Sequence, residues 1–492
     1  MSEIPDKRSA LRLGEGSYQV PAHVLQQREL TRDRLKTSVF DVLVIGGGIV
    51  GAGVARDAAM RGLHVGLVEQ YDFAFGTSSR SSRLLHGGLR YLAQGRIGLV
   101  REASREKCIL HRIAPHLAQP LPFVFPTYRR TSWPLWQLRI GVKLYDWLCG
   151  GQNLGRSSAL SGAEVEARLS GIRTAGLTGG VRYFDALTND ARLVIDSLRS
   201  AAQYGAIVLN YSQVEDVSPV RSQGWECQVR DRVSNEVYAL TAHNIVNATG
   251  PWAPRMKASK VALRLTKGVH LVVDGHRCAV PDACVLVEGN RILFAIPWGE
   301  RVILGTTDTD YSGSLDDVPV EPSDIDYVLG VINRGFPGVQ LQGEDVLATW
   351  AGVRPLVTSV SGNPSDISRA HQITMPSPGW FDVVGGKLTT YRLIGEQVID
   401  RVAARTPKAI DRCRTAEESL LSGLESASAS GASAIVPPKP DGRLVEHYCR
   451  AEWAVFPEDV MRRRGGWQYY CVDAEGICGN VRDWMAGWHG ER

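Results

Sequence analysis

Residues 40–69, FDVLVIGGGIVGAGVARDAAMRGLHVGLVE, decide the fold of this chain. An apolar run breaks into glycines at Gly46, Gly48 and Gly51, which have the spacing G-x-G-x-x-G; an alanine-rich helical pattern and a second apolar run ending in Glu69 follow. The three glycines permit a tight turn, a close approach of backbone to a pyrophosphate, and packing of the helix on the strand. The segment predicts a βαβ unit that binds a dinucleotide, with Glu69 accepting hydrogen bonds from a ribose. The alternative is a glycine-rich turn in an ordinary α/β fold.

The composition is that of an ordinary soluble enzyme. The 492 residues are enough for two or more domains, each with its own core. A net charge of +4 is too small to indicate nucleic-acid binding. Nine scattered cysteines without C-x-x-C spacing indicate reduced thiols in a cytosolic compartment, and they predict neither a disulfide framework nor a metal site.

No targeting or membrane-spanning segment is predicted. The polar residues 1–8 lack the apolar centre of a signal peptide. No run approaches the roughly 20 apolar residues that span a bilayer. We therefore expect a cytoplasmic protein that is either soluble or held peripherally on the inner face of the cytoplasmic membrane.

Two further segments combine glycines with polar side chains. Residues 76–92 are rich in serine and glycine and include His86 before two glycines, which suits repeated contact with a polar cofactor chain. Residues 383–392 form a second strand–glycine–helix junction, which suits an anion or a polarised ring at a helix start. Together with residues 248–250 (Ala-Thr-Gly), they give more segments suited to contact a cofactor than a nicotinamide dehydrogenase requires.

Six short runs carry a resemblance to a known family. The longest are SSRLLHGGLRYL (81–92), GVRPL (352–356) and GGKLTTYR (385–392), and the supporting runs are KGVH (267–270), IPWG (296–299) and GTTD (305–308). The runs together are far more specific than any one of them, and the match covers about residues 40–405 in unbroken order. On these motifs the chain resembles the FAD-dependent glycerol-3-phosphate dehydrogenases.

The resemblance implies an α/β fold. It implies a Rossmann-like FAD-binding domain of the glutathione-reductase or D-amino-acid-oxidase type, an inserted β-rich substrate-capping domain and a short helical C-terminal module. The pattern between residues 99 and 147 is mostly helical. The expected boundaries are an N-terminal leader, 1–39; an oxidoreductase core, 40–405, with FAD-binding segments at about 40–125, 180–255 and 350–405; a linker, 406–440; and a short C-terminal module, 441–492.

The resemblance also implies a reaction. Family members oxidise sn-glycerol 3-phosphate to dihydroxyacetone phosphate by hydride transfer from C2 to FAD, and they pass the electrons to quinone or, in some members, to oxygen. Two alternatives stay open. One is a flavin-dependent oxidase or dehydrogenase of another small hydroxy- or amino-acid, and the other is a non-catalytic flavin-binding assembly or sensor protein.

A phosphate monoester needs convergent cations, because arginine gives bidentate charged hydrogen bonds and lysine a point charge. His270 is the expected general base, because a neutral imidazole can accept a hydroxyl proton. Arg354 can polarise that hydroxyl but is too basic to accept its proton. By the resemblance, the substrate-binding residues are Arg90, Tyr91, Arg354, Arg369 and Lys387.

The expected cofactor contacts come from the glycine junctions, the hydroxyl-rich segment and the family match. They are Gly46, Gly48, Ile49, Gly51, Glu69, Thr77, Ser78, Ser82, Arg83, Leu84, His86, Gly87, Gly88, Val214, Ala248, Thr249, Gly250, Gly386, Lys387, Leu388 and Thr389.

Two regions bear on partners. Residues 128–147 mix three tryptophans with basic residues, which suits a helix lying on an anionic membrane; the alternative is a helix packed on the domain with its cations in water. The C-terminal residues 441–492 are shorter than the family's usual helical domain and contain the unusual run GGWQYYC (465–471). A homodimer is the expected assembly if the chain is oligomeric.

Overall fold

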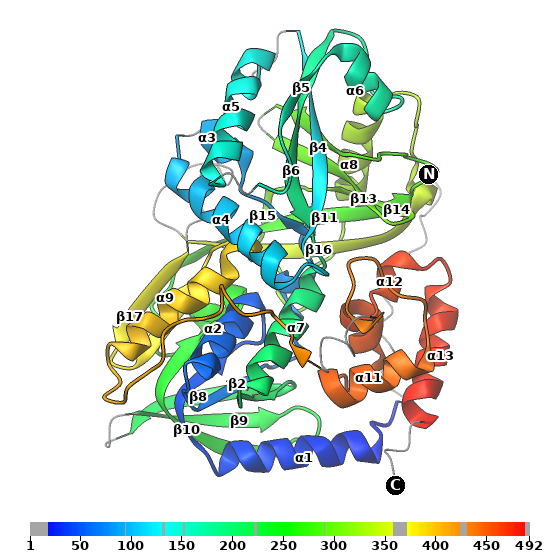
Figure 1. The fold of residues 1–492 in the computed structure, drawn as a ribbon. Helices are drawn as coiled ribbons and strands as arrows, with labels where there is room; N and C mark the ends of the chain where they lie inside the picture. The colour runs from blue at the N-terminus through cyan, green and yellow to red at the C-terminus, as the bar shows by residue number, and fades with distance from the viewer. Residues whose placement is uncertain are drawn as a thin grey trace.

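The computed structural model of the chain contains two large sheets, one above the other in Figure 1, with the C-terminal helices packed beside both. The N-terminal helix α1 lies beneath the lower sheet, and the helices α11 to α13 flank the molecule on the right. The structure describes residues 18–93, 95–129, 133–150, 153–220, 224–289, 291–357, 371–423 and 431–487. The side chains of Arg90 and Ala93 are not among the described parts.

The lower sheet contains the βαβ unit predicted from residues 40–69. Its central strands run parallel in the order β18-β10-β1-β2-β7, and an antiparallel strand, β17, and a β8-β9 meander complete it. The strands are β1 (Val39–Ile45), β2 (Val65–Val68), β7 (Ile207–Leu209), β8 (Ser212–Val220), β9 (Gly224–Asp231), β10 (Val237–Asn247), β17 (Gln372–Ser377) and β18 (Trp380–Val384). Parallel strands bury both faces, which explains their continuous apolar runs.

Three helices cover one face of this sheet: α2 (Ile49–Met60), α7 (Asp190–Gln203) and α9 (Tyr391–Ala403). The helices α2 and α9 approach closely because both carry glycine at their crossing. A Cβ atom on Gly395 would lie 2.6 Å from the carbonyl oxygen of Gly53. This glycine contact sets how near the two helix N-termini lie to the carboxyl ends of the parallel strands.

The N-terminal segment is partly integral to the fold and is not only a surface leader as expected. Residues Ala22–Lys36 form α1, which packs against the lower sheet (Figure 1). The buried Arg28 donates to the side chain of Asn210 at 2.8 Å and to Asp231 at 3.2 Å. The helical pattern of these residues is weak because the helix is mostly polar, and its buried face combines only two apolar side chains, Val24 and Leu35, with Arg28 and Arg32.

The upper sheet is mostly antiparallel and follows the order β15-β11-β14-β13-β12-β4-β6-β3, with β16 paired to β11 and β5 to β6. Its strands are β3 (Leu84–Leu85), β4 (Gln119–Tyr128), β5 (Ser158–Leu160), β6 (Leu177–Leu187), β11 (Leu263–Asp274), β12 (Ala283–Glu288), β13 (Arg291–Trp298), β14 (Arg301–Gly305), β15 (Thr309–Asp310) and β16 (Val346–Val357). This is the β-rich inserted part expected from the sequence.

Strand β4 was missed within residues 99–147, which are mostly helical as predicted. It pairs with β6 along its whole length, although it contains three prolines. Proline is disfavoured inside sheets, so the sequence argued against a strand here. The flanking helices α4 (Ile97–Ile113) and α5 (Leu135–Leu148) do form.

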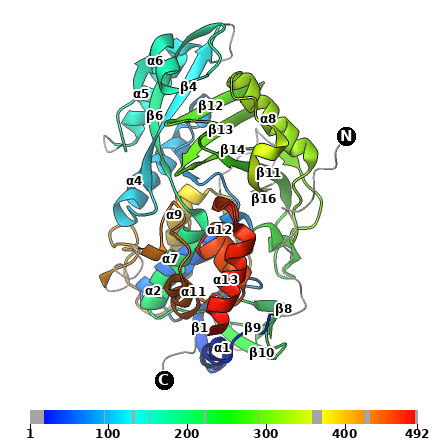
Figure 2. The same ribbon diagram turned by 90° about the vertical axis from the view of Figure 1, so that its right-hand side faces the viewer.

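Helices pack on both faces of the upper sheet. The face that α8 (Pro322–Gly335) and α6 (Gly162–Arg168) cover holds one apolar core, and the face that α3 (Leu89–Ala93), α4 and α5 cover holds another. Figure 2 shows α8 on one side of the upper sheet and α4 and α5 on the other. The cavity described below lies where this second core meets the lower sheet.

The C-terminal module has a small core of its own and is bound to the rest of the protein by buried charges. It comprises α11 (Gly442–Glu452), a π-helical turn (Asp459–Arg464), α12 (Trp467–Tyr470) and α13 (Ala474–Gly487). Glu452 accepts hydrogen bonds of 2.6 and 2.7 Å from the two guanidinium ends of Arg192 on α7. Asp72 accepts from Arg463 and Arg464, and all three side chains are buried.

The expected linker is also packed where the structure describes it. Ser433 donates to Asp196 at 2.6 Å, and the carbonyl oxygen of Ile435 accepts from the indole of Trp298 at 2.8 Å. Ile435 is buried in the core beneath the upper sheet. Residues 431–440 are therefore a docked segment, and their small side chains reflect close packing instead of a free spacer.

We predict that Glu452→Ala lowers the free energy of unfolding by about 3–5 kcal/mol, because it leaves the Arg192 guanidinium charged in the core without its bidentate partner. Urea denaturation followed by circular dichroism measures this loss. Asp483→Ala removes an exposed carboxylate of the same module and should change the value by no more than about 0.5 kcal/mol. Equal effects of the two substitutions would show that the buried pair does not hold the module in place.

Candidate functional site

The glycine-rich turn forms a cradle at the N-terminus of α2. Gly46 has a φ of +110°, and a Cβ atom there would lie 2.6 Å from the carbonyl oxygen of Ala248. A Cβ atom on Gly51 would overlap the carbonyl oxygen of Gly46, so the helix can meet the strand only through glycine. At Gly48 the only described atoms within 4 Å of such a Cβ are the side-chain atoms of Ser78, so this glycine borders open space.

Glu69 ends β2 beside this cradle, as predicted. Its carboxylate accepts from the backbone N–H of Gly47 at 2.7 Å and of Tyr71 at 2.9 Å. Burial raises the pKa of the Glu69 carboxyl above its ordinary value. A buried carboxyl with oxygen lone pairs still facing a cavity is stabilised by further donors, such as the hydroxyls of a ribose.

A cavity of about 560 Å³ extends from this cradle along the carboxyl ends of the parallel strands. In open α/β sheets this is the edge where nucleotides bind. Of the predicted cofactor contacts, it is lined by Gly46, Gly48, Ile49, Glu69, Thr77, Ser78, Val214, Ala248, Thr249, Gly250, Gly386, Lys387 and Leu388. A glycine cradle, a terminal carboxylate and a helix N-terminus along one elongated cavity suit an extended dinucleotide such as FAD.

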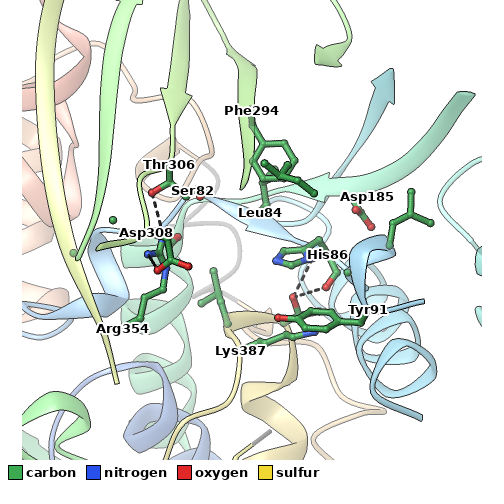
Figure 3. Close-up of a pocket in the computed structure, with 18 of the residues that line it drawn as sticks. Ser82, Leu84, His86, Tyr91, Asp185, Phe294, Thr306, Asp308, Arg354 and Lys387 are labelled. Atoms are coloured by element: carbon green, nitrogen blue, oxygen red, sulfur yellow. Dashed lines mark hydrogen bonds and ion pairs between the residues drawn. The ribbon is translucent and has the colours of Figure 1, made fainter. Parts of the chain in front are cut away.

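A second cavity, of about 480 Å³, continues from the first beneath the upper sheet (Figure 3). The two share several lining residues, among them Thr77, Ser81 and Lys387. The second cavity is also lined by the predicted residues Ser82, Leu84, His86, Gly88, Tyr91, His270, Arg354 and Thr389. The structure thus brings segments about 300 residues apart in sequence to one continuous space between the sheets.

Arg354 projects from β16 into the second cavity (Figure 3). Its guanidinium donates to the Thr306 hydroxyl at 3.0 Å and pairs with the Asp308 carboxylate at 3.3 Å. The facing strand carries Gly268, where a Cβ atom would overlap the guanidinium. Absence of that side chain gives Arg354 the room to lie along the cavity wall.

Lys387 follows β18 at the second glycine junction, between the two cavities. Its Nζ atom lies 4.1 Å from the centroid of the Tyr91 ring, which is a cation–π distance. Figure 3 shows Lys387, Tyr91 and Arg354 around the same space. The backbone of Arg90 lies in α3, but its side chain is outside the described parts, and Arg369 falls within 358–370, which the structure does not describe. Their substrate roles stay predictions.

His270 lies in the middle of β11 and lines the second cavity. Its Nε2 atom is 2.7 Å from the Ser82 hydroxyl, and its ring stacks on Trp350 with centroids 5.3 Å apart. Burial, and then the nearby cations Arg354 and Arg83, lower the pKa of His270 to about 3. The imidazole is therefore neutral near pH 7, as a proton acceptor must be, but it is a weaker base than the near-neutral titration expected from the sequence.

Three predicted cofactor contacts line neither cavity and instead pack behind the residues that do. Gly51 packs α2 on β1, as its position in the motif predicts. Arg83 is buried, with its guanidinium carbon 4.2 Å from the ring centroid of Trp298. Gly87 lies against the Tyr145 ring, and its N–H donates to the Tyr145 hydroxyl at 2.8 Å.

A buried polar network behind Gly87 was not predicted. Lys107, which is fully buried on α4, donates to Asp185 at 2.9 Å and to the carbonyl oxygen of Phe184 at 2.8 Å. Tyr145 also donates to Asp185, and Asp185 lines the second cavity. The network fixes the loop that carries His86. Lys107 lies in a helix that looked ordinary, so no sequence signal pointed to it.

Other lining residues were also missed as site residues. Thr306 and Asp308 belong to the run GTTD (305–308), which supported the family resemblance but received no role. Two further cations, Arg80 and Arg291, also line the cavity, and several aromatic or apolar residues come from strands of the upper sheet: Phe123, Phe125, Tyr183, Val285, Ile292 and Phe294. Alternating strand residues are normally assigned to a core, so only the fold reveals that these face a cavity.

Comparison with known proteins agrees with this geometry. Residues 41–401 match the FAD dependent oxidoreductase family model. The chain is 38% identical over 401 residues to the aerobic glycerol-3-phosphate dehydrogenase of Staphylococcus saprophyticus subsp. saprophyticus, covering 79% of this chain and 72% of that protein.

Solved structures give the same result. The glycerol-3-phosphate dehydrogenase from Bacillus halodurans, complexed with FAD, superposes with a TM-score of 0.73 at 26% identity over 94% of this chain and 92% of that one. The L-alpha-glycerophosphate oxidase from Mycoplasma pneumoniae, with FAD bound, has a TM-score of 0.60 at 16% identity over 76% and 98% of the two chains, and shares the fold. The chain belongs to the FAD dependent oxidoreductase family and, within it, to the relatives of the aerobic glycerol-3-phosphate dehydrogenases.

Proposed function

We propose that this protein oxidises sn-glycerol 3-phosphate to dihydroxyacetone phosphate and passes the electrons to a membrane quinone. The observation that carries the proposal is a cation-bearing cavity, with Arg354 and Lys387, that is continuous with a dinucleotide cradle. The carboxylate of a small amino or hydroxy acid carries one negative charge, whereas a phosphate monoester carries close to two near pH 7 and so suits a pair of cations better. The 38% identical aerobic glycerol-3-phosphate dehydrogenase supports the same substrate.

Arg354 and Lys387 are proposed to bind the phosphate and so to place C2 of the substrate. Arginine offers a planar fork for two phosphate oxygens, and lysine adds a point charge. Thr306 and Asp308 hold the guanidinium at 3.0 and 3.3 Å, so little side-chain freedom is lost when the phosphate binds. FAD, when bound, supplies the two-electron oxidation at C2.

His270 is proposed to receive the proton of the C2 hydroxyl. Because its Nε2 atom is 2.7 Å from the Ser82 hydroxyl, and Ser82 also lines the cavity, the proton has a path either to the imidazole itself or through Ser82. The surrounding side chains exclude water: Trp350 covers one face of the imidazole and is itself buried. Arg354 stabilises the developing alkoxide and remains protonated.

The same cavity also has walls that suit an apolar electron acceptor. Phe123, Phe125, Tyr183 and Phe294 line it with flat apolar surfaces, beside the cations that line it elsewhere. Trp133, which also lines the cavity, directly precedes α5. A quinone ring could stack on such walls, whereas dioxygen needs no aromatic site of this size.

Helix α5 is proposed to face the membrane. It buries Leu138, Val142 and Tyr145, but its opposite side exposes Trp136 and Ile140 at 62% each and Trp147 at 73%. Arg139 and Lys143 are exposed on the same helix. Exposed tryptophans beside cations suit the interface of an anionic bilayer. Across the described residues, none of the helices has the length and apolarity to cross a bilayer.

The phosphate role predicts that Arg354→Ala lowers kcat/KM for sn-glycerol 3-phosphate by on the order of 10²-fold. A charged hydrogen bond is worth about 1.5–3 kcal/mol, and part of that energy orients the substrate. FAD content should stay at the wild-type level. Steady-state assays with a soluble dye as acceptor measure the loss.

Two controls sharpen this test. Arg264→Ala removes a cation of the neighbouring strand that does not line the cavity, and it should leave kcat/KM unchanged. Activity on glycerol, which lacks the phosphate, should fall less in Arg354→Ala than activity on glycerol 3-phosphate, because on glycerol only the interaction with the developing alkoxide is lost. Equal losses on both substrates would move the phosphate site away from Arg354.

The proton role predicts that His270→Asn slows flavin reduction by about 10²–10⁴-fold while FAD and substrate still bind. Because the pKa of His270 is about 3, protonation of this histidine should not lower the wild-type rate of flavin reduction between about pH 5 and pH 8. Stopped-flow reduction with C2-deuterated substrate gives both results. Fast reduction in the variant, with an isotope effect like that of the wild type, would assign the proton to another group.

The membrane role predicts that replacing Trp136, Ile140 and Trp147 with serine weakens sedimentation with vesicles of phosphatidylglycerol at least 10-fold. Activity with a quinone dissolved in those vesicles should fall in parallel, whereas activity with a water-soluble dye should stay at the wild-type level. The control variant replaces Leu30 and Val472, which are exposed at 62% and 76% on other surfaces. If both variants bind vesicles like the wild type, α5 is not the membrane contact.

A further inference from the structure

The C-terminal module reaches the back of the active cavity through two consecutive tyrosines of α12. The rings of Tyr469 and Trp350 meet edge-to-face, with centroids 5.3 Å apart and an interplanar angle of 63°. The rings of Tyr470 and Trp298 meet in the same way, at 4.9 Å and 78°. Both tryptophans are buried in the upper sheet, and Trp350 stacks on the lining residue His270, so the module touches the layer directly behind the site.

Trp350 is the residue that connects Tyr469 to His270. The two residues are register partners across strands β11 and β16, and their rings are nearly parallel, at 20°. The Trp350 indole N–H also donates to the carbonyl oxygen of Ser81 at 3.2 Å. The next residue is Ser82, whose hydroxyl lies 2.7 Å from His270. Trp350 therefore fixes the imidazole in two ways. Its ring stacks on the face of the imidazole, and its indole N–H holds the backbone next to Ser82, the hydrogen-bond partner of His270.

The module is anchored so that Tyr469 cannot swing away. Arg463 and Arg464, a few residues before α12, pair with the buried Asp72 of the lower half. On the other side the Tyr470 hydroxyl accepts from the N–H of Glu300 at 3.0 Å, and its carbonyl oxygen accepts from Arg301 at 3.0 Å. Helix α12 is thus held by both halves of the protein, with the Tyr469 ring against Trp350 between them.

The groups around His270 make its charge state depend on a dry environment. Among the described residues, the charged side chains that lower its pKa are Arg354 from β16, which is itself paired with Asp308, and Arg83, whose guanidinium carbon lies 5.2 Å from the Trp350 ring centroid. Burial is the largest cause of the lowered pKa, ahead of both cations. A change that admits water behind the imidazole would therefore bring its pKa back toward the ordinary value of about 6.5.

We propose that Tyr469 is a positioning residue of the reaction, which holds Trp350 flat on His270 and keeps water away from the imidazole. The C-terminal module thereby completes the active site instead of serving only as a surface addition. This inference rests on the proposed role of His270 in the oxidation of glycerol 3-phosphate. It needs the Tyr469 ring and not its hydroxyl, because the contact is between the two aromatic rings.

The test compares Tyr469→Ala with the conservative Tyr469→Phe in the FAD-loaded protein. In Tyr469→Ala the rate of flavin reduction should fall about 10-fold between about pH 8 and pH 5.5, since a histidine of ordinary pKa is only about one tenth neutral one pH unit below that pKa. Tyr469→Phe and the wild type should show no such limb. NMR titration of histidine-labelled protein, with the His270 signal identified by its loss in His270→Asn, should show His270 titrating only in Tyr469→Ala.

Tyr469→Leu keeps most of the volume and replaces the alanine variant if that variant does not fold. Tyr470→Phe is the structural comparator, because it removes the hydrogen bond to Glu300 but keeps the ring on Trp298; it should lower thermal stability and leave both pH profiles unchanged. Wild-type pH profiles in Tyr469→Ala or Tyr469→Leu, at full FAD content, would overturn the positioning role. Failure of glycerol 3-phosphate to reduce the wild type would instead refute the proposed function.

Discussion

The contact of α2 with β1 through Gly51 and Gly46 is the constraint on which the rest of the site depends. Because no side chain separates them, the helix N-terminus, the turn at Gly48 and the carboxylate of Glu69 lie along one wall of a cavity. The second glycine junction, at 385–387 after β18, lines this cavity and also the second cavity beneath the upper sheet. The substrate-side residues are useful only because this backbone contact sets where a dinucleotide can lie.

Much of this arrangement could be predicted from the sequence, because it depends on local rules. Glycine spacing, apolar runs and helical periodicity predicted β1, α2, β2 and the junction before α9. The proline-containing strand β4 could not be predicted, since its stability comes from pairing with β6 over distant sequence. The docked segment at 431–440 is similar: its small residues look like a linker until the fold shows Ser433 and Ile435 in contact with the core.

Site residues that belong to short sequence motifs could be predicted. Site residues that only the pairing of distant strands brings to the cavity could not. Arg354, Lys387 and Tyr91 came from short runs and lie around one cavity. Asp308 and Thr306 reach Arg354 only because β16 and the segment after β14 both lie beside β11. The protonation state of His270 likewise depends on its neighbours, because burial among cations moves its pKa far from the value that histidine suggests by itself.

The central claim is that the bound flavin is reduced by glycerol 3-phosphate. Anaerobic mixing of the purified, FAD-loaded protein with sn-glycerol 3-phosphate, followed by visible absorbance, tests it most directly. The account predicts rapid loss of the oxidised flavin's absorbance and one dihydroxyacetone phosphate per flavin, and a far slower loss on mixing with glycerol. A flavin that stays oxidised with glycerol 3-phosphate, but is bleached by another small hydroxy- or amino-acid or by none, would contradict it.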